Sequence, residues 1–240
     1  MAWFFSEIEP TNFFTITGEQ AKHISLSLRM REGEELTLCC GEYVYPCVID
    51  KTGKGEVKVR VLGKQLCDSE PSVELVLFQA LPKGDKMDYI VRKSVELGVK
   101  RIVPFLSSRC VSRPDLKTIE KKTARWQKIA LSAAEQSRRG MIPTVEQAVS
   151  FETAVKMAGG LENTVVFYEC GGENPGKVLS PQTRELGIFI GSEGGFAPEE
   201  IETLKENGAK VATLGKRILR AETAPVAAIS VIMYITGNMG

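Results

Sequence analysis

Two short loops near the C-terminal end of the chain combine glycines with charged side chains, as ligand-binding loops often do. The first, Gly191-Ser192-Glu193-Gly194-Gly195-Phe196, directly follows the apolar run Ile188-Phe189-Ile190. Its three glycines permit positive φ angles and a close approach of the backbone to a ligand. The second, from Leu214 to Ala224, leads straight into a largely apolar segment. One such loop alone is better explained as a tight turn. Two charged loops in adjacent strand–loop–helix units favour a shared ligand site.

The common nucleotide-binding signatures are missing around these loops. After the first strand of the second half stands Gln79-Ala80-Leu81-Pro82-Lys83-Gly84, where a dinucleotide-binding fold would carry Gly-x-Gly-x-x-Gly. A P-loop ending in Gly-Lys-Ser/Thr is also missing. None of the six cysteines forms a Cys-x-x-Cys pair, and His23 is the single histidine, so a metal site is a poor prediction. We expect a cofactor bound mainly by backbone groups, no metal, and free thiols in a reducing cytoplasm.

Basic side chains are concentrated in one segment of the chain. Residues 83–139 carry 15 basic and 6 acidic side chains, a net charge of +9, whereas the whole chain has a net charge of +1. Such a segment is a candidate surface for phosphates, and a solvated lysine-rich helix face explains it equally well. The longest apolar runs are too short to span a bilayer, and the N-terminus does not resemble a secretory signal. The chain is therefore expected to be cytoplasmic and not bound to a membrane.

The elements that must position the two loops divide the chain into two parts. Residues 1–68 predict a small β-barrel with one helix over Gly18–Arg29, because short β-branched and aromatic runs alternate with glycines. Its expected strands are Trp3–Phe5, Asn12–Ile16, Glu35–Cys40, Glu42–Asp50 and Glu56–Leu62.

From residue 72 to residue 240, strands and helices alternate. The expected strands are Val73–Ala80, Arg101–Phe105, Thr164–Tyr168, Gly187–Ile190 and Lys210–Leu214. The expected helices are Lys86–Leu97, Leu116–Gln136, Phe151–Ala158, Pro198–Asn207 and Thr223–Thr236. Fully apolar strands alternating with helices predict an α/β fold whose mainly parallel sheet is covered on both faces. Ligands of such sheets bind beyond the carboxyl ends of the strands, where the two loops lie.

Several motifs, in order and over nearly the whole chain, match one known family. They are Ala80–Asp88, Lys93–Val99, Pro104 with Ser108-Arg109, Arg125-Trp126, Ala133–Arg139, Ile190–Phe196 and Leu214–Ala224, preceded by His23, Arg29 and Gly33-Glu34-Glu35. With these motifs the chain resembles the bacterial 16S ribosomal RNA uridine N3-methyltransferases, members of the SPOUT superfamily of knotted methyltransferases. The last two motifs, at this spacing, are the most specific part of the resemblance.

The resemblance implies a fold and an activity. It implies a PUA-like RNA-binding β-barrel over residues 1–68 and a SPOUT methyltransferase domain over residues 72–240, whose C-terminal chain passes through a loop as a deep trefoil knot. It further implies a homodimer that uses S-adenosylmethionine to methylate N3 of a uridine in 16S rRNA of the small ribosomal subunit, uridine 1498 in the customary rRNA numbering. The alternatives are a SPOUT methyltransferase with another RNA target and a non-catalytic RNA-binding module.

The resemblance also implies roles for residues in the two loops. When N3 of a uracil is methylated, a proton leaves the ring, and a nearby cation would stabilise the resulting negative charge. Arg220 is the candidate for that cation, with an ion pair to Glu222 or Glu193 as its alternative role. Glu222 either accepts the proton or orients Arg220, and Thr223 is expected to cap the last helix. The residues expected to contact the cofactor are Ile190, Gly191, Glu193, Gly194, Gly195, Leu214, Gly215, Ile218, Leu219, Thr223 and Ala224.

RNA contacts are expected from basic side chains in both halves of the chain. The candidates are His23, Arg29, Lys83, Lys86, Arg109, Arg113, Arg138 and Arg139. Three positions depart from the family pattern. Ser192 stands where a proline is usual, Ala197 where a helix-capping serine or threonine is common, and Trp3 where an arginine is usual.

Overall fold

The computed structural model describes residues 2–239, which form two compact units. The first unit comprises the chain up to Glu70 together with Ala134–Met141, and the second comprises Pro71–Ala133 and the chain from Ile142 onward. The segment Ala134–Met141, which the sequence assigned to the second domain, therefore makes most of its contacts with the first unit. Within the described residues, no helix has both the length and the apolar character needed to cross a membrane.

The first unit is built on a six-stranded sheet. Its strands are β1 (Ala2–Phe5), β2 (Phe13–Thr17), β3 (Glu35–Cys40), β4 (Tyr43–Thr52), β5 (Glu56–Val61) and β6 (Gln65–Leu66), and its helical segments are α1 (Gly18–Lys22) and a π-helix over His23–Ser27. The strand order is β1-β3-β4-β5-β2, with β6 paired to β4. All pairs are antiparallel except β1 with β3.

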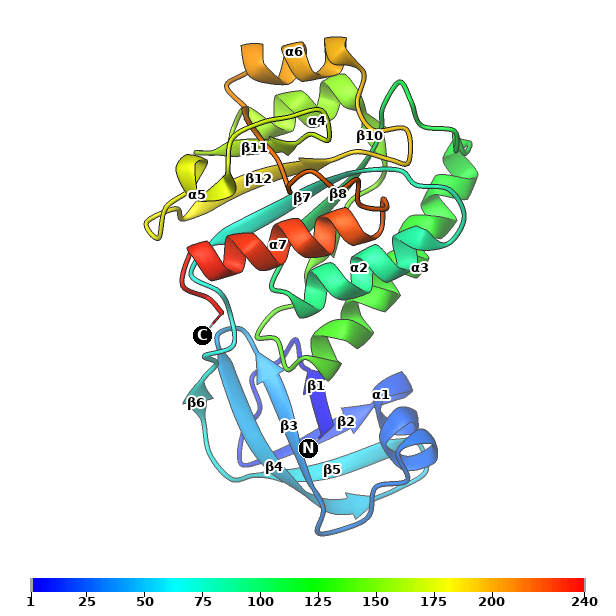
Figure 1. Cartoon of the computed structure of the whole chain (residues 1–240). Coiled ribbons are helices and arrows are strands. Elements are labelled where there is room, and N and C mark those ends of the chain that lie inside the picture. The colour runs from blue at the N-terminus through cyan, green and yellow to red at the C-terminus, as the bar shows by residue number, and fades with distance from the viewer. Residues whose placement is uncertain (1, 240) are drawn as a thin grey trace. The chain divides into compact units, whose positions relative to one another are not determined.

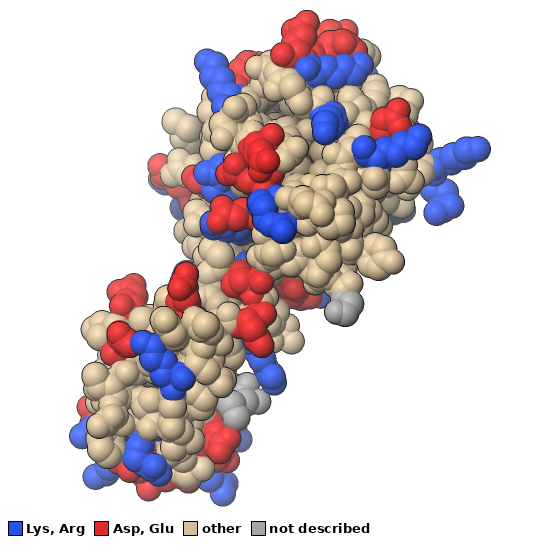
Figure 2. Space-filling model, turned by 90° about the vertical axis from the view of Figure 1, so that its left-hand side faces the viewer, with Lys and Arg blue, Asp and Glu red and all other residues tan. Residues whose placement is uncertain are grey.

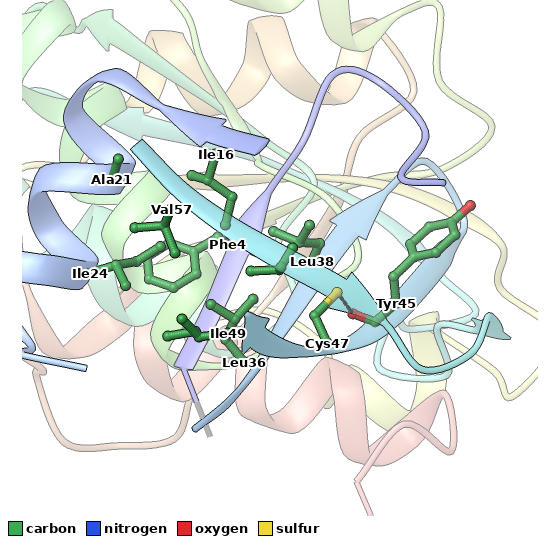
Figure 3. Packing of buried hydrophobic residues seen from close by; sticks show 11 residues of the cluster. Phe4, Ile16, Ala21, Ile24, Leu36, Leu38, Tyr45, Cys47, Ile49 and Val57 are labelled. Atoms are coloured by element: carbon green, nitrogen blue, oxygen red, sulfur yellow. Dashed lines mark hydrogen bonds between the residues drawn. The ribbon is translucent and has the colours of Figure 1, made fainter. Parts of the chain in front are cut away.

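A single apolar cluster forms the core of this unit (Figure 3). Phe4 of β1 and Ile16 of β2 come from the two ends of the strand order, and Ala21 and Ile24 of the helical segment belong to the same cluster. The helical segment therefore packs on the core together with the two edge strands, which completes the predicted small β-domain around one core.

The predicted helix over Gly18–Arg29 is wrong in its second half. Five residues after α1 adopt a π-helix, with the Leu28 amide donating to the His23 carbonyl at 2.9 Å. The Ser25 hydroxyl donates to the Ala21 carbonyl at 2.7 Å, and this kind of back-bonding disturbs regular helices. Leu26 and Leu28, expected on the apolar face, are 70% and 45% exposed. The chain leaves the helical segment at Arg29, which has a φ of 54°.

Arg139, a candidate for phosphate contact, is instead buried in the first unit. Its side chain is 3% exposed, and its guanidinium donates two hydrogen bonds to the Glu70 carboxylate, at 2.8 Å and 2.6 Å. The Glu70 carboxylate also accepts from the Gly140 amide at 2.8 Å, and the Trp3 indole donates to the Arg139 carbonyl at 3.1 Å. The prediction for Arg139 is therefore wrong, because its charge is already neutralised by Glu70. Its neighbour Arg138 stays exposed.

The second unit alternates strands and helices as predicted. Its strands are β7 (Glu74–Ala80), β8 (Arg101–Leu106), β9 (Thr144–Val145), β10 (Val149–Ser150), β11 (Thr164–Phe167), β12 (Glu185–Ile190) and β13 (Lys210–Ala212). Its helices are α2 (Lys86–Glu96), α3 (Leu116–Gln136, whose last three residues belong to the first unit), α4 (Phe151–Ala158), α5 (Pro175–Val178), α6 (Pro198–Glu206) and α7 (Thr223–Ile235). The sequence did not predict β6, β9, β10 or α5, each of two to four residues.

The seven strands form one parallel sheet in the order β10-β8-β7-β12-β11-β13, with β9 paired to β8. Figure 1 shows α2, α3 and α7 on one face of the sheet and α4 and α6 on the other. Strands covered on both faces must be apolar on both faces, which explains the continuous apolar runs of β7 and β12. Phe78 and Phe189, from these two strands, stack with their ring centroids 4.5 Å apart.

Two helix starts differ from the sequence-based expectation. Thr223 is the first residue of α7 and does not cap it; Glu222 holds the cap position, without a side-chain cap bond. At α6, Ala197 cannot cap through its side chain, but the Glu200 carboxylate accepts from the Ala197 amide at 2.9 Å. The same carboxylate accepts from the Ser108 amide at 2.8 Å, which links the start of α6 to the loop that follows β8.

Candidate functional site

A cavity of about 440 Å³ opens at the carboxyl edge of the parallel sheet. Its lining comes from the segments that follow three neighbouring strands, β11, β12 and β13, and from Lys86 at the start of α2. The volume lies in the range of pockets that bind small molecules. The cavity thus lies beyond the carboxyl ends of the strands, where parallel sheets bind their ligands.

The structure brings nearly all of the predicted loop residues to this cavity. Those that line it are Ile190, Gly191, Glu193, Gly194, Gly195, Leu214, Gly215, Ile218, Leu219, Arg220 and Ala224. Thr223 and Glu222 are not among the lining residues. Glu222 contacts the lining residue Lys86 through an ion pair.

The glycines of the first loop are required by close packing. A Cβ atom at Gly191 would lie 3.1 Å from Gly195 Cα, and one at Gly194 would lie 3.0 Å from Arg109 Cβ. At Gly195, which has a φ of +64°, a Cβ atom would overlap the Glu169 carboxylate, whose Cδ lies 2.7 Å from that position. The Gly195 amide donates to the Ser192 carbonyl at 3.0 Å, which closes the turn. Side chains at these positions would therefore fill or distort the wall of the cavity.

Lys86 connects the two loops. Its ammonium lies 2.8 Å from a Glu193 oxygen in the first loop and 3.3 Å from a Glu222 oxygen in the second. The Glu193 carboxylate also accepts from the Lys83 amide, at 3.2 Å and 3.3 Å. Lys86, a candidate for RNA contact, thus lines the cavity and is already paired with two carboxylates.

These contacts shift the pKa values of all three groups. Hydrogen bonding to Glu193 is the largest effect that raises the pKa of Lys86. Burial acts to raise the pKa of Glu193, but hydrogen bonds from Lys86 and the backbone outweigh it and lower that pKa. A backbone hydrogen bond, followed by Lys86 and the charge of Arg220, lowers the pKa of Glu222. Both carboxylates are therefore ionised at neutral pH, and Glu222 is a weak proton acceptor.

Arg220 lies at the rim of the cavity with an exposed side chain. Within the described residues, the alternative ion pairs to Glu193 and Glu222 are not formed, because Lys86 takes both carboxylates. The Arg220 backbone carbonyl accepts from the Thr223 amide at 2.8 Å and from the Ala224 amide at 2.9 Å. The start of α7 therefore holds the backbone of Arg220 while its guanidinium remains available at the cavity.

The family is decided by sequence profiles that match along most of the chain. A profile of an RNA methyltransferase domain matches residues 69–233, and a profile of an RNA methyltransferase PUA domain matches residues 16–62. The chain belongs to the RNA methyltransferase family. The predicted fold class, a SPOUT-type α/β domain with a small PUA-like domain, is thereby confirmed.

Named relatives agree with this family. The methyltransferase is 35% identical to ribosomal RNA small subunit methyltransferase E of Bacillus subtilis (strain 168), over 96% of this chain and 93% of the relative. It is 30% identical to the protein of the same name from Aquifex aeolicus, over 96% of this chain and 98% of the relative. A small subunit methyltransferase E from Neisseria gonorrhoeae, solved with bound S-adenosyl methionine, has a TM-score of 0.88 at 29% identity and covers 98% of this chain and 97% of its own. A Legionella pneumophila methyltransferase, solved with bound cofactor SAM, has a TM-score of 0.87 at 31% identity and covers 97% of this chain and 96% of its own.

Four lining residues of the methyltransferase lie outside the two predicted loops and were not among the predicted site residues. They are Phe167, Tyr168 and Glu169, which end or follow β11, and Thr213, which follows β13. The carboxyl-end rule, applied to β11 as it was to β12 and β13, would have found the first three. Glu169 matters most, because its carboxylate packs against Gly195 and forms no hydrogen bond or ion pair among residues 2–239. Within the same range, no cluster of three or more His, Cys, Asp or Glu side chains is arranged to bind a metal.

The remaining RNA candidates fall into two groups. Lys83, Arg109 and Arg113 belong to the second unit and are exposed. The Arg109 guanidinium donates to the Gly194 carbonyl at 3.1 Å, which places a cation directly on the glycine loop of the cavity. His23, Arg29 and Arg138 belong to the first unit and are also exposed, with the His23 ring 6.1 Å from that of Phe4 in an edge contact. Figure 2 shows acidic and basic side chains interspersed over one face of each unit, with no broad region of a single sign.

Proposed function

We propose that this methyltransferase uses S-adenosylmethionine to methylate N3 of a uridine in the 16S rRNA of the small ribosomal subunit, with uridine 1498 as the expected position. The observation that carries the proposal is the cavity formed by the glycine-rich loop after β12 and the charged loop Leu214–Ala224, with Arg220 exposed at its rim. Relatives that share the name ribosomal RNA small subunit methyltransferase E, and solved relatives with bound S-adenosylmethionine, support it.

The residues around the cavity fit this cofactor. The ligand carries an aromatic adenine whose flat faces pack on apolar side chains, a ribose with two hydroxyl groups and a charged methionine part, and it supplies its methyl group from a sulfonium ion. Glycine backbone at residues 191, 194, 195 and 215 leaves room for close backbone contacts, and Ile190, Leu214 and Leu219 offer apolar surface. Glu169 provides a carboxylate that is not neutralised by a neighbouring side chain. Such a carboxylate suits ribose hydroxyls or the positive charges of the ligand.

Arg220 is proposed as the catalytic cation. As the N3 proton leaves, negative charge spreads over N3 and the two flanking oxygens of the uracil ring. A guanidinium near these atoms lowers the energy of that state, and its planar set of donors matches adjacent acceptors. Because Glu222 does not line the cavity and its carboxylate is held by Lys86, we infer that Glu222 orients the charges around Arg220 and does not take the proton.

Lys86 offers a test of how the two loops are held together. Lys86→Met is expected to raise the Kd for S-adenosylmethionine about tenfold, because Glu193 and Glu222 would then repel each other without a shared cation. Lys83→Met is the matched control, since only the backbone amide of Lys83 contacts Glu193. Isothermal titration calorimetry measures both affinities. Equal affinities for the two variants would show that Lys86 does not organise the cavity.

The proposal includes a homodimer and the knotted path of the C-terminal chain. Helix α7 contains no charged residue and is apolar on nearly every side, yet Val231 is 36% exposed and Tyr234 is 74% exposed. A helix that is apolar all round is normally buried, so a second copy packed on α7 is expected. Sedimentation velocity measures the mass of the particle in solution, and a dimer is the expected result. A ribosomal substrate also implies that the enzyme works in the cytoplasm.

One experiment separates this function from its alternatives. The purified enzyme is incubated with methyl-labelled S-adenosylmethionine and with 30S particles from a strain that lacks it, and the labelled nucleotide is mapped by mass spectrometry. The expected result is one methyl group at N3 of a single uridine of 16S rRNA. A label at another nucleotide or in another RNA would identify a different target. The absence of cofactor binding in calorimetry would favour a non-catalytic RNA-binding module.

A further inference from the structure

One face of α3 carries a row of exposed cations. Lys117, Lys121, Arg125 and Lys128 follow one another at spacings of four, four and three residues, which places them on one side of the helix. The opposite side, with Ile119, Trp126 and Ala130, is buried. We call these four cations the α3 stripe. From Lys117 to Lys128 it spans about 16 Å, since the helix rises 1.5 Å for each of the 11 steps between them.

The stripe is also open to close approach by a partner. The exposed residues that share its face, Ala124 and Ser132, are small and uncharged, and Glu120 lies at its edge. Elsewhere on the surface, lysines pair with local carboxylates, as Lys93 does with Glu96 and Lys205 with Glu202. Within residues 2–239, none of the three lysines of the stripe forms an ion pair.

The stripe is joined to the cavity by a row of further cations. The loop between β8 and α3 holds Arg109, which donates to the Gly194 carbonyl of the glycine loop. The same loop holds Arg113, whose guanidinium donates to the carbonyls of residues 107 and 108 at 3.2 Å and 3.1 Å. Lys117 follows in the first turn of α3. A second link is the ion pair of Arg125 with Asp88 of α2, the helix that begins at the cavity residue Lys86. Figure 1 shows α2 and α3 on the same face of the sheet.

We propose that the α3 stripe binds the phosphodiester backbone of the RNA substrate and leads the strand to the cavity. The inference rests on the proposed function, and it assigns a binding surface to residues outside the cavity. Lysine ammonium groups on flexible stems act as point charges that bind phosphates without reading sequence. The three lysines of the stripe, which form no ion pair among residues 2–239, lie along about 16 Å of helix and fit a run of regularly spaced phosphates on one strand, while Arg125 between them is held by Asp88.

The test is a triple variant, Lys117→Gln, Lys121→Gln and Lys128→Gln, in the full-length enzyme. Its binding to 30S particles that lack the modification is measured by filter binding between 50 and 200 mM salt. Each phosphate neutralised by a protein cation contributes about 0.7 to 0.9 to the slope of log K against log salt. The triple variant is therefore expected to lower that slope by about 2, and to weaken binding about 10- to 100-fold in the lower half of the salt range. Its affinity for S-adenosylmethionine and its thermal midpoint should stay unchanged, because the three side chains are exposed.

The matched control removes the same charge elsewhere in the second unit. Lys156→Gln, Lys177→Gln and Lys205→Gln replace three exposed lysines on α4, α5 and α6. The control should keep the wild-type salt slope. If both triple variants lowered the slope equally, net charge alone would act, and the proposal would be overturned. A wild-type slope in the α3 variant, with normal methyl transfer, would overturn the role of the stripe alone. Failure of the wild-type enzyme to methylate 30S particles would overturn the proposed function together with it.

Discussion

Arg220→Ala is expected to lower the rate of methyl transfer by about 100- to 1,000-fold, the usual cost of removing one donor that stabilises a developing anion. The guanidinium is exposed at the rim of the cavity, and its two nearby carboxylates are held by Lys86. Its removal therefore breaks no hydrogen bond or ion pair found among residues 2–239, and the fold should be unchanged. The Kd for S-adenosylmethionine should change no more than a few-fold. Single-turnover methylation of 30S particles and calorimetry measure the two quantities separately.

Arg217→Ala is the matched control for this variant. Arg217 is also an exposed arginine that lines the cavity, three residues away on the same loop. If Arg220 acts on the reacting atoms, the control should lose less than tenfold in rate, and Arg220→Lys should retain part of the activity because it keeps the charge. Near-normal turnover by Arg220→Ala would move the catalytic role to another residue. Equal losses in both arginine variants would indicate a general effect of positive charge at the rim.

Much of the second unit was predictable because its parallel sheet is buried on both faces. Runs such as Val73–Ala80 and Gly187–Ile190 have one physical explanation, a strand with no solvent-exposed side, and they appear as β7 and β12. Once the strands are parallel, their carboxyl ends must meet at one edge of the sheet. The prediction that the loops of two successive strand–loop–helix units share a ligand site therefore followed from topology, without any knowledge of the ligand.

Features that depend on contacts between distant segments could not be predicted in this way. Arg139 looked like a surface cation because local sequence carries no sign of Glu70, which neutralises it in the first unit. Lys86 looked like an RNA contact because its two carboxylate partners lie in loops more than 100 residues away. The end of the regular helix within Gly18–Arg29 depends on tertiary packing. Ile24 is buried in the core of the first unit, whereas Leu26 stays exposed, and the local sequence does not distinguish the two.

The basic segment over residues 83–139 shows why a count of charges along the sequence does not by itself locate an RNA-binding surface. Some of its cations are used inside the protein, as Arg139 with Glu70 and Lys86 with Glu193 show. Several other cations of the segment are exposed and form no ion pair among residues 2–239. Of these, Lys83, Arg109, Arg113 and Arg138 were RNA candidates, whereas Lys117, Lys121 and Lys128 were not. By sequence alone, both a phosphate-binding surface and a solvated helix face explain the cations of α3. The salt dependence of RNA binding distinguishes them, because a merely solvated lysine does not release counterions from the RNA.

Gly195→Val is expected to raise the Kd for S-adenosylmethionine about 100-fold, which corresponds to about 2.7 kcal/mol of binding free energy. Gly195 has a φ of +64°, a conformation that β-branched residues strongly disfavour. In addition, a Cβ atom there would displace the Glu169 carboxylate, which lines the cavity. The substitution therefore both strains the glycine loop and removes the free carboxylate from its place. Calorimetry with S-adenosylmethionine and thermal unfolding separate the binding effect from the loss of stability.

Gly208→Val is the control that separates the effect of backbone strain on stability from the effect of an altered cavity on cofactor binding. Gly208 has a φ of +85° and no atom within 4 Å of its Cβ position, and it follows α6 away from the cavity. Both variants should lose a similar amount of stability, about 1–2 kcal/mol for a side chain in the left-handed region, but only Gly195→Val should lose cofactor affinity. Adding Glu169→Ala to Gly195→Val removes the collision, so the double variant should bind more tightly than Gly195→Val alone. Wild-type affinity in Gly195→Val would show that the close contact between Gly195 and Glu169 plays no part in shaping the site.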